Sequence, residues 1–224
     1  MAPDVDPEAA RPATLTWSLV IPVKLLAQAK SRLTGLAGQR RSDVALAMAA
    51  DTMAAAIAAD DVAAVLVVTD DPDVGAIGAS LGAVVLADSA AAGLNEALAH
   101  GAAYSRDRWP DRGRAGLAGD LPAVRPAELT AALAMAAPLG TAFVPDSDGT
   151  GTTLYAAAPG ARFRPRFGPA SRDRHLATGA AEIGIDLAGL RRDVDTIEDL
   201  RAAARIGLGP RTQAIVGTGG MGAE

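Results

Sequence analysis

Hydrophobic residues in this chain alternate between short apolar runs and longer stretches where they recur at helical spacing. The short runs, rich in Val, Leu and Ile, predict buried strands, because β-branched side chains favour extended backbone. Strands are expected at Leu19–Val23, Ala64–Thr69, Ala83–Ala87, Ala115–Ala118 and Thr141–Val144, and helices between them at residues 40–59, 71–82, 94–103 and 126–137. This alternation predicts an α/β fold around a mainly parallel sheet, with right-handed crossovers.

The fourth expected strand, Ala115–Ala118, continues the alternation although its residues are poor strand formers. Beyond the fifth strand, residues 145–155 indicate a turn rich in glycine and hydroxyls that re-enters a strand. The remaining elements are expected as a short helix from Ser171 to about Thr178, late strands at Ile183 and Leu190–Val194, and a closing helix over Thr196–Ile206 that ends at Gly207.

The chain is expected to form one folded domain. Residues 1–13 are rich in Pro, Ala and acidic residues without periodicity, which predicts a disordered leader. Residues 14–209 would form the domain, and residues 210–224 a flexible tail. With 224 residues and no long linker, a single sizeable core is the simplest organisation.

Composition excludes several classes of protein. The chain has no cysteine and two histidines, which excludes disulfides, thiolate zinc sites, cysteine nucleophiles and multi-histidine metal sites. No stretch approaches the roughly 20 apolar residues that span a bilayer, and the acidic N-terminus does not look like a cationic secretory leader. We therefore expect a cytoplasmic protein without a membrane partner.

Positive charge is concentrated although the net charge is −5. The overall acidity argues against a nucleic-acid partner, and local basic segments suit small polyanions better. The two segments hold Lys24, Lys30, Arg32, Arg40 and Arg41, and Arg162, Arg164, Arg166, Arg172 and Arg174. The first follows a buried strand, where α/β proteins bind phosphates. A solvated basic loop is the alternative.

Three carboxylates stand at expected strand ends and could hold a metal ion. Asp120 follows the fourth strand, and Asp193 and Asp195 flank Val194, so that both would point to one face of an extended segment. Oxygen ligands of this kind suit Mg²⁺, which takes one or two carboxylates and completes its shell with water and substrate phosphates. Alternatively, Asp120 is a turn residue, and Asp195-Thr196 begins a helix with Glu198 completing a capping box.

Two further segments could bind an anion. Residues 149–153, Gly-Thr-Gly-Thr-Thr, offer backbone N–H groups and hydroxyls, although a hairpin turn explains them equally well. Ser171 lies near the start of an expected helix, where amide donors favour phosphate and where a serine can also serve as N-cap. His175 is interpreted as a surface or packing residue rather than a catalytic one.

An ordered set of motifs resembles one protein family. The motifs are VIPVK with AKSRL, then GLNEAL, GDLP, GTGTT, RFGPAS and DVDT, running from about Leu15 to Pro210. This set is similar to the 2-phospholactate or phosphoenolpyruvate guanylyltransferases that make the activated intermediate of the deazaflavin coenzyme F-420. The resemblance implies a single-domain, Rossmann-like nucleotidyltransferase fold of the nucleotide-diphospho-sugar transferase type, with helices on both faces of a mostly parallel sheet.

The resemblance also implies an activity and a site. In the actinobacterial branch, which the RFGPAS segment resembles, GMP passes from GTP to phosphoenolpyruvate. The implied residues are Thr152, Gly168 and Ser171 for phosphoenolpyruvate, Lys24, Lys30, Arg32 and Asn95 for the nucleotide, Asp120, Asp193 and Asp195 for Mg²⁺, and Asp120, Lys24 and Lys30 for catalysis.

Other interpretations stay open at this point. The same chemistry on 2-phospho-L-lactate or 3-phosphoglycerate differs around one or two carbons of the acceptor. A non-catalytic nucleotide-binding partner of the same pathway would account for the weak fourth strand. The sequence leaves open whether the protein forms a homodimer or hands its product to the next enzyme of the coenzyme pathway.

Overall fold

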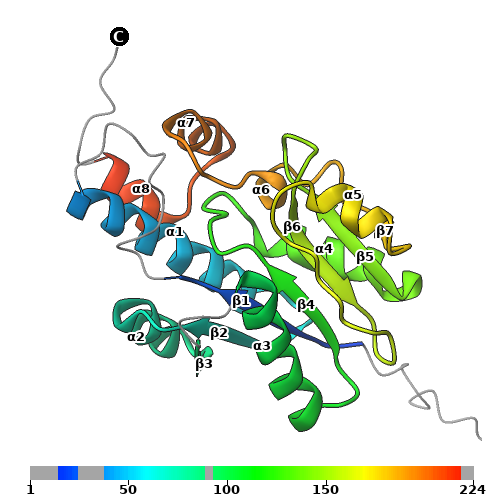
Figure 1. The fold of residues 1–224 in the computed structure, drawn as a ribbon. Coiled ribbons are helices and arrows are strands. Elements are labelled where there is room, and N and C mark those ends of the chain that lie inside the picture. The colour runs from blue at the N-terminus through cyan, green and yellow to red at the C-terminus, as the bar shows by residue number, and fades with distance from the viewer. Residues whose placement is uncertain (1–14, 25–37, 89–92, 218–224) are drawn as a thin grey trace, which may run out of the picture.

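The computed structural model describes residues 15–24, 38–88 and 93–217, which form an α/β fold around one seven-stranded sheet (Figure 1). The strand order is β3-β2-β1-β4-β6-β5-β7. Strands β1 to β4 pair in parallel, β6 is antiparallel to both neighbours, and β7 pairs in parallel with β5. The strands are β1 Trp17–Pro22, β2 Val62–Thr69, β3 Val84–Ala87, β4 Gly113–Leu117, β5 Thr141–Pro145, β6 Thr152–Ala157 and β7 Ala181–Glu182. The expected mainly parallel sheet is confirmed.

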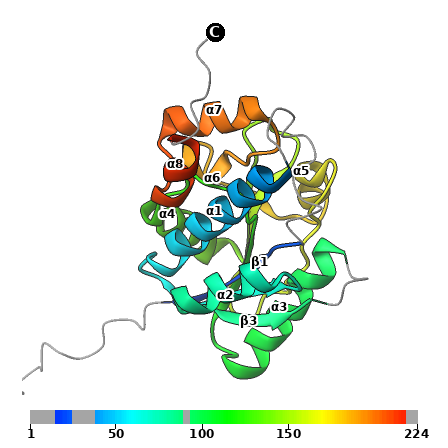
Figure 2. The same ribbon diagram turned by 90° about the vertical axis from the view of Figure 1, so that its left-hand side faces the viewer.

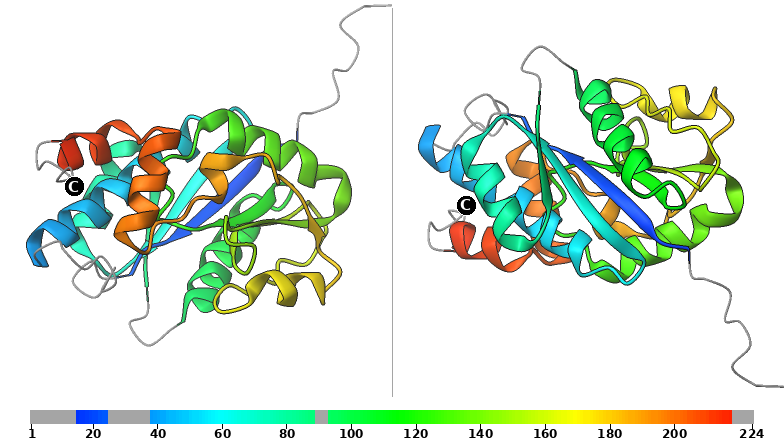
Figure 3. Two further views of the ribbon diagram at one scale, coloured as in Figure 1. Left: turned by 90° about the horizontal axis from the view of Figure 1, so that it is seen from above. Right: turned by 90° about the horizontal axis from the view of Figure 1, so that it is seen from below.

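Helices cover both faces of the sheet (Figure 3). One face packs on α1, α2 and α4 through side chains such as Met53, Val74 and Leu133, and the other packs on α3 through Leu98. The helices are α1 Gly38–Ile57, α2 Pro72–Leu81, α3 Leu94–Arg108, α4 Pro126–Ala136, α5 Ser171–Leu176, α6 Ala188–Arg191, α7 Ile197–Ile206 and α8 Pro210–Gly217, with a 3-10 turn at Ala137–Leu139. Asp71 caps α2 and Gly82 ends it, as predicted.

The weak fourth strand exists and is buried along its whole length. The glycines of β4 face large side chains. Trp17 lies opposite Gly113, and the Trp17 ring fills the space that a Cβ on Gly113 would need. Gly116 likewise faces the side chain of Leu98, which a Cβ there would approach to 2.7 Å. The low strand propensity of β4 therefore reflects close packing against Trp17 and Leu98 rather than a failing element.

Of the two late strands predicted in the C-terminal third, one is absent. Leu190–Val194 is not a strand, because the chain forms the short helix α6 up to Arg191 and then runs on as irregular backbone. The strand expected at Ile183 is present as the two-residue β7, Ala181–Glu182, and Ile183 N still donates to Phe143 O of β5 at 3.0 Å. The buried side chains of Leu190 and Val194 produced an apolar pattern that does not distinguish a strand from a helix.

The tail is not flexible throughout, because α8 packs beside α1 (Figure 2). The buried carboxylate of Asp51, on α1, accepts hydrogen bonds from the backbone N–H groups of Arg211 (3.2 Å) and Thr212 (2.8 Å) at the start of α8. Val216 of α8 is buried in a cluster with Val44 and Met48 of α1. The leader expected at 1–13 and the residues from 218 onward lie outside the described residues.

No helix in the described ranges is both long and apolar enough to cross a membrane.

Candidate active site

A cavity of about 770 Å³ opens at the edge of the sheet where β1, β4 and β5 end, within the size range of small-molecule sites. The residues that follow these strands lie at this edge: Lys24 after β1, Asp120 after β4 and Asp146 after β5. The charged residues that line it, within the described ranges, are Lys24 and the aspartates Asp120, Asp146, Asp148, Asp193, Asp195 and Asp199. The described part of the cavity is therefore strongly acidic.

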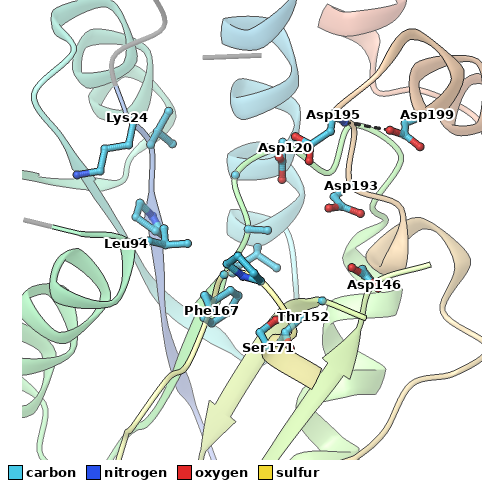
Figure 4. Close-up of a pocket in the computed structure, with 18 of the residues that line it drawn as sticks. Lys24, Leu94, Asp120, Asp146, Thr152, Phe167, Ser171, Asp193, Asp195 and Asp199 are labelled. Atoms are coloured by element: carbon cyan, nitrogen blue, oxygen red, sulfur yellow. Dashed lines mark hydrogen bonds between the residues drawn. The ribbon is translucent and has the colours of Figure 1, made fainter. Parts of the chain in front are cut away.

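The predicted metal ligands Asp120, Asp193 and Asp195 lie together on one side of the cavity (Figure 4). The backbone N–H of Val194 donates to the carbonyl of Asp120 at 3.1 Å, which joins the two segments that carry them. Because Asp193 and Asp195 flank Val194, this bond holds both of them next to the turn that follows β4.

The carboxylates on this side repel one another. Burial, followed by the charges of Asp120, Asp146 and Asp195, raises the pKa of Asp193 to about 7. In the part of the chain that the structure describes, no three His, Cys, Asp or Glu side chains converge closely enough to hold a metal ion by themselves. The cluster is a region of negative charge that further ligand atoms would have to complete.

Asp199 lines the cavity but serves the start of α7. Its carboxylate accepts hydrogen bonds from the backbone N–H groups of Asp195 (3.3 Å) and Thr196 (2.9 Å), and Thr196 is the N-cap. These bonds lower the pKa of Asp199 despite its partial burial. The capping box predicted here is confirmed in kind, but Asp199 completes it and Glu198 does not.

The predicted acceptor-binding residues Thr152, Gly168 and Ser171 all line the cavity, and Figure 4 shows Thr152 and Ser171 in its lower part. The side chains of Thr152, at the start of β6, and Ser171, at the start of α5, lie close together there, and both residues are buried. Gly168 has a φ of +111°, which L-residues rarely adopt, and a Cβ on it would come within 3.2 Å of Arg174.

The turn after β5 uses two amides of the candidate anion-binding segment, residues 149–153, for its own hydrogen bonds. Asp146 accepts hydrogen bonds from two N–H groups of this turn. Its carboxylate accepts from Thr150 N at 2.9 Å, and its backbone carbonyl accepts from Gly149 N at 3.2 Å. The amides at the start of α5 are also occupied, because Ser171 N donates to Gly168 O and Arg172 N to Thr150 O.

The arginines of residues 162–174 do not line the cavity. Arg172 forms an ion pair with Glu182 at 2.6 Å, and Arg174 donates to the carbonyls of Phe167 (3.3 Å) and Pro169 (2.5 Å). Arg174 thereby stabilises the loop around Gly168 and Arg172 ties α5 to β7, so the expectation that these arginines bind the ligand directly is not supported.

Lys24 lies on the opposite side of the cavity from the aspartates (Figure 4). Its Nζ forms a 2.8 Å ion pair with Asp88, which follows β3, while the side chain stays 44% exposed. The predicted nucleotide-binding residues Lys30 and Arg32 lie outside the described residues.

Asn95, at the start of α3, lies beside the cavity rather than in its lining. Its side-chain Nδ2 donates to Phe167 O at 3.0 Å, and its Oδ1 accepts from Phe167 N at 2.9 Å. The described contacts of Asn95 therefore fix the loop that leads to Gly168.

Two residues of the site were missed or undervalued from sequence. Asp146 follows a strand and begins an Asp-Ser-Asp-Gly turn, a position where its carboxylate could have been expected to face the ligand edge. His175 is fully buried and forms a hydrogen bond with Thr152. It lies four residues after Ser171, on the same face of α5. The interpretation of His175 as a packing residue describes its burial and omits its contact with Thr152.

Solved structures with the same fold are nucleotidyltransferases. A protein from Desulfovibrio desulfuricans G20, assigned to the nucleotide-diphospho-sugar transferases, matches with a TM-score of 0.67 at 16% identity, over 89% of this chain and 93% of the other. A nucleotidyl transferase from Methanothermobacter matches with a TM-score of 0.56 at 18% identity, over 85% of this chain and 97% of the other. These matches confirm the predicted Rossmann-like nucleotidyltransferase fold.

Sequence relatives are closer. A phosphoenolpyruvate guanylyltransferase from Thermomonospora curvata is 56% identical over 93% of this chain and 92% of its own length. One from Streptomyces coelicolor is 52% identical over 90% of this chain and 96% of its own length. The family model "Guanylyl transferase CofC like" matches residues 17–203. The chain therefore belongs to the CofC-like guanylyl transferase family.

Proposed function

We propose that this protein transfers GMP from GTP to the phosphate of phosphoenolpyruvate, releasing enolpyruvyl-diphospho-5'-guanosine and pyrophosphate for coenzyme F-420 biosynthesis. The observation that carries the proposal is the composition of one cavity in a chain 56% identical to a phosphoenolpyruvate guanylyltransferase. Carboxylates lie on one side of that cavity, Lys24 on another, and the hydroxyls of Thr152 and Ser171 between them.

The reaction needs no protein base. A phosphate monoester has a second pKa of about 6, so the acceptor is already an anionic nucleophile near neutrality. One of its phosphate oxygens attacks the α-phosphorus of GTP in line, a new P–O bond forms, and the bond to the β-phosphate oxygen breaks as pyrophosphate leaves. The barrier lies in bringing two polyanions together, so positioning and charge neutralisation supply the catalysis.

The chain's cavity fits a hard divalent cation such as Mg²⁺. Its donors are carboxylate oxygens, and the crowding that raises the pKa of Asp193 would be relieved by a cation. Since no three described side chains suffice alone, one or two of Asp120, Asp193 and Asp195 would share the ion with substrate phosphates. When bound, Mg²⁺ would withdraw charge from the α-phosphate and the leaving pyrophosphate.

The remaining residues would position the two substrates. Lys24 would neutralise the GTP phosphates from the side opposite the aspartates, and Lys30 and Arg32 are proposed to add to that positive charge. Thr152 and Ser171 would donate hydroxyl hydrogen bonds to phosphoenolpyruvate, and Gly168 would leave room for it beside the loop.

Pyrophosphate release tests the proposal. The protein would be incubated with GTP and Mg²⁺, with phosphoenolpyruvate, 2-phospho-L-lactate or 3-phosphoglycerate as acceptor, and we expect phosphoenolpyruvate to give the fastest release. Faster release with another acid would reassign the acceptor. No release with any of the three, together with calorimetric GTP binding, would instead indicate a non-catalytic nucleotide-binding protein.

A further inference from the structure

His175 is a buried polar side chain held between three aromatic rings. Its imidazole stacks on Tyr155 at a centroid distance of 4.7 Å and also contacts Phe143 and Phe167. The residue is 0% exposed, yet both ring nitrogens have partners. Both nitrogens are thus satisfied, as burial requires, and the identity of the two partners defines what the ring can do.

The partners also fix which ring nitrogen carries the proton. The backbone N–H of Arg166 can only donate, and it lies 2.8 Å from Nε2. Nε2 must therefore accept, which places the proton of the neutral imidazole on Nδ1. Nδ1 lies 2.9 Å from Oγ1 of Thr152, so the imidazole donates and the hydroxyl oxygen accepts.

A doubly protonated ring would break this arrangement. An Nε2–H would face the Arg166 N–H, and a buried charge would stand near the cationic side chains of Arg174 and Arg166. Burial first, and then these two arginines, lower the pKa of His175 to about 4. The ring consequently stays neutral, with the same tautomer, across the neutral pH range.

The fixed tautomer decides what the Thr152 hydroxyl can do. Because its oxygen accepts from His175, its own proton is not used in that bond and can be donated elsewhere. Among the described residues no second partner of this hydroxyl is found, and Thr152 lines the cavity. Ser171 lies on the same face of α5 as His175, so this helix presents one hydroxyl itself and orients the other.

We propose that His175 is a positioning residue that makes the Thr152 hydroxyl a dedicated hydrogen-bond donor toward the anionic acceptor. The identity of that acceptor as a phosphorylated carboxylic acid rests on the proposed function. Because Nδ1–H occupies one lone pair of its oxygen, the Thr152 hydroxyl is oriented to offer its proton to the cavity, which favours an anion over a donor group at that position. His175 itself does not touch the substrate.

Steady-state kinetics of isosteric variants test this role. In His175→Gln the amide can reach the Nε2 position and keep Arg166 satisfied while leaving Thr152 without its donor, and His175→Asn can keep the donor near the Nδ1 position. We expect His175→Gln to raise the KM for phosphoenolpyruvate about tenfold with the KM for GTP unchanged. His175→Asn should retain most of the acceptor affinity, and His100→Gln, on the exposed face of α3, should change neither constant.

A double-mutant cycle separates positioning from packing. Thr152→Val removes the hydroxyl with little change of shape and should also raise the acceptor KM about tenfold. Adding His175→Gln to Thr152→Val should then cost almost nothing more, because the two residues act through one hydrogen bond. Additive losses, or an equal rise in the KM for GTP, would overturn the proposal.

The tautomer can be measured without any variant. In ¹⁵N-labelled wild-type protein, the imidazole signals of His175 should show a protonated Nδ1 and an unprotonated Nε2 from pH 6 to 8. A proton on Nε2 would overturn the inference even if the enzyme is fully active. Conversely, the expected tautomer in a protein that releases no pyrophosphate would remove the proposed function and leave the His175–Thr152 contact intact.

Discussion

Asn95 holds the backbone of Phe167 from both sides, donating from Nδ2 to Phe167 O at 3.0 Å and accepting at Oδ1 from Phe167 N at 2.9 Å. The two residues are 72 positions apart in sequence, so one side chain ties α3 to the loop that carries Gly168. The sequence had suggested a nucleoside contact for Asn95. The observed pairing indicates that its first task is to shape the acceptor side of the cavity.

Replacing Asn95 tests this assignment. Asn95→Asp keeps the shape but removes the donor and places a carboxylate against the Phe167 carbonyl, so the loop should lose one of its anchors. We expect the KM for the acceptor to rise about tenfold while the preference for GTP over ATP is unchanged, as measured by pyrophosphate release. Glu96→Gln, on the exposed neighbour, serves as control. Loss of base preference in Asn95→Asp would instead support a nucleoside contact.

The crowded carboxylates predict a variant that gains stability as it loses activity. The pKa of Asp193 is raised to about 7 by its burial and then by the charges of Asp120, Asp146 and Asp195, so its charge opposes folding at pH 8 when no cation is present. Asp193→Asn should therefore raise the metal-free Tm by at least about 2–4 °C and abolish turnover. The measurement is thermal unfolding with and without Mg²⁺.

The control for this experiment is Asp186→Asn, the same change of charge at an exposed residue outside the cavity lining. It should alter neither the Tm nor the rate appreciably. A lower metal-free Tm for Asp193→Asn would mean that this carboxylate makes a stabilising contact that outweighs the repulsion.

His175 should make the protein less stable at acidic pH. Its folded pKa of about 4 lies below the value of about 6.5 expected in the unfolded chain, so the unfolded state binds the extra proton first. Its contribution to the free energy of unfolding is fully present above pH 6.5. As the pH falls from there through about 4, this contribution is lost, about 3 kcal/mol over the whole range.

Urea unfolding of wild type and His175→Gln at pH 7 and pH 4.5 would measure this. Asp193 contributes an opposite slope in the same window, but it is present in both proteins and cancels in the difference. The wild type should lose more stability than the variant on acidification. Parallel losses would show that His175 is protonated at its ordinary pKa.

The helix α8 should depend on Asp51. Asp51→Ala removes the acceptor of the Arg211 and Thr212 N–H groups, whereas Asp51→Asn keeps one acceptor oxygen. We expect Asp51→Ala to lower the free energy of unfolding by about 1–3 kcal/mol and to speed tryptic cleavage at Arg211. Asp51→Asn should fall between it and the wild type. Unchanged proteolysis in Asp51→Ala would mean that burial of Val216 alone fixes the helix.

Much of the fold was readable from local pattern. The strands at residues 64–69 and 141–144 and the α2 caps at Asp71 and Gly82 are set by side chains close in sequence, so periodicity and capping residues suffice. Elements fixed by distant partners were either weakly indicated, as β4 was, or missed, as α8 was. The glycines of β4 make sense only once Trp17 and Leu98 are seen beside them, and α8 only once Asp51 is seen at its start.

The site shows the same division. Five residues that strand ends and the ordered motifs indicated line one cavity: Asp120, Asp193, Asp195, Thr152 and Ser171. The arginines beyond residue 162 were misassigned, because charge density in a sequence does not reveal that Arg172 already faces Glu182. His175 was undervalued since a lone histidine acquires a role only through its neighbours, here Thr152 and the Arg166 amide.

The loop before α5 is held by hydrogen bonds to its main chain. Asn95 pairs with the amide and carbonyl of Phe167, and His175 accepts from the amide of Arg166. Hydrogen bonds to the main chain do not depend on which side chains the loop carries. Exchanging those side chains would therefore leave these main-chain bonds in place. The loop thus offers a backbone, already held from two sides, on which new side chains can be tried at the edge of the cavity.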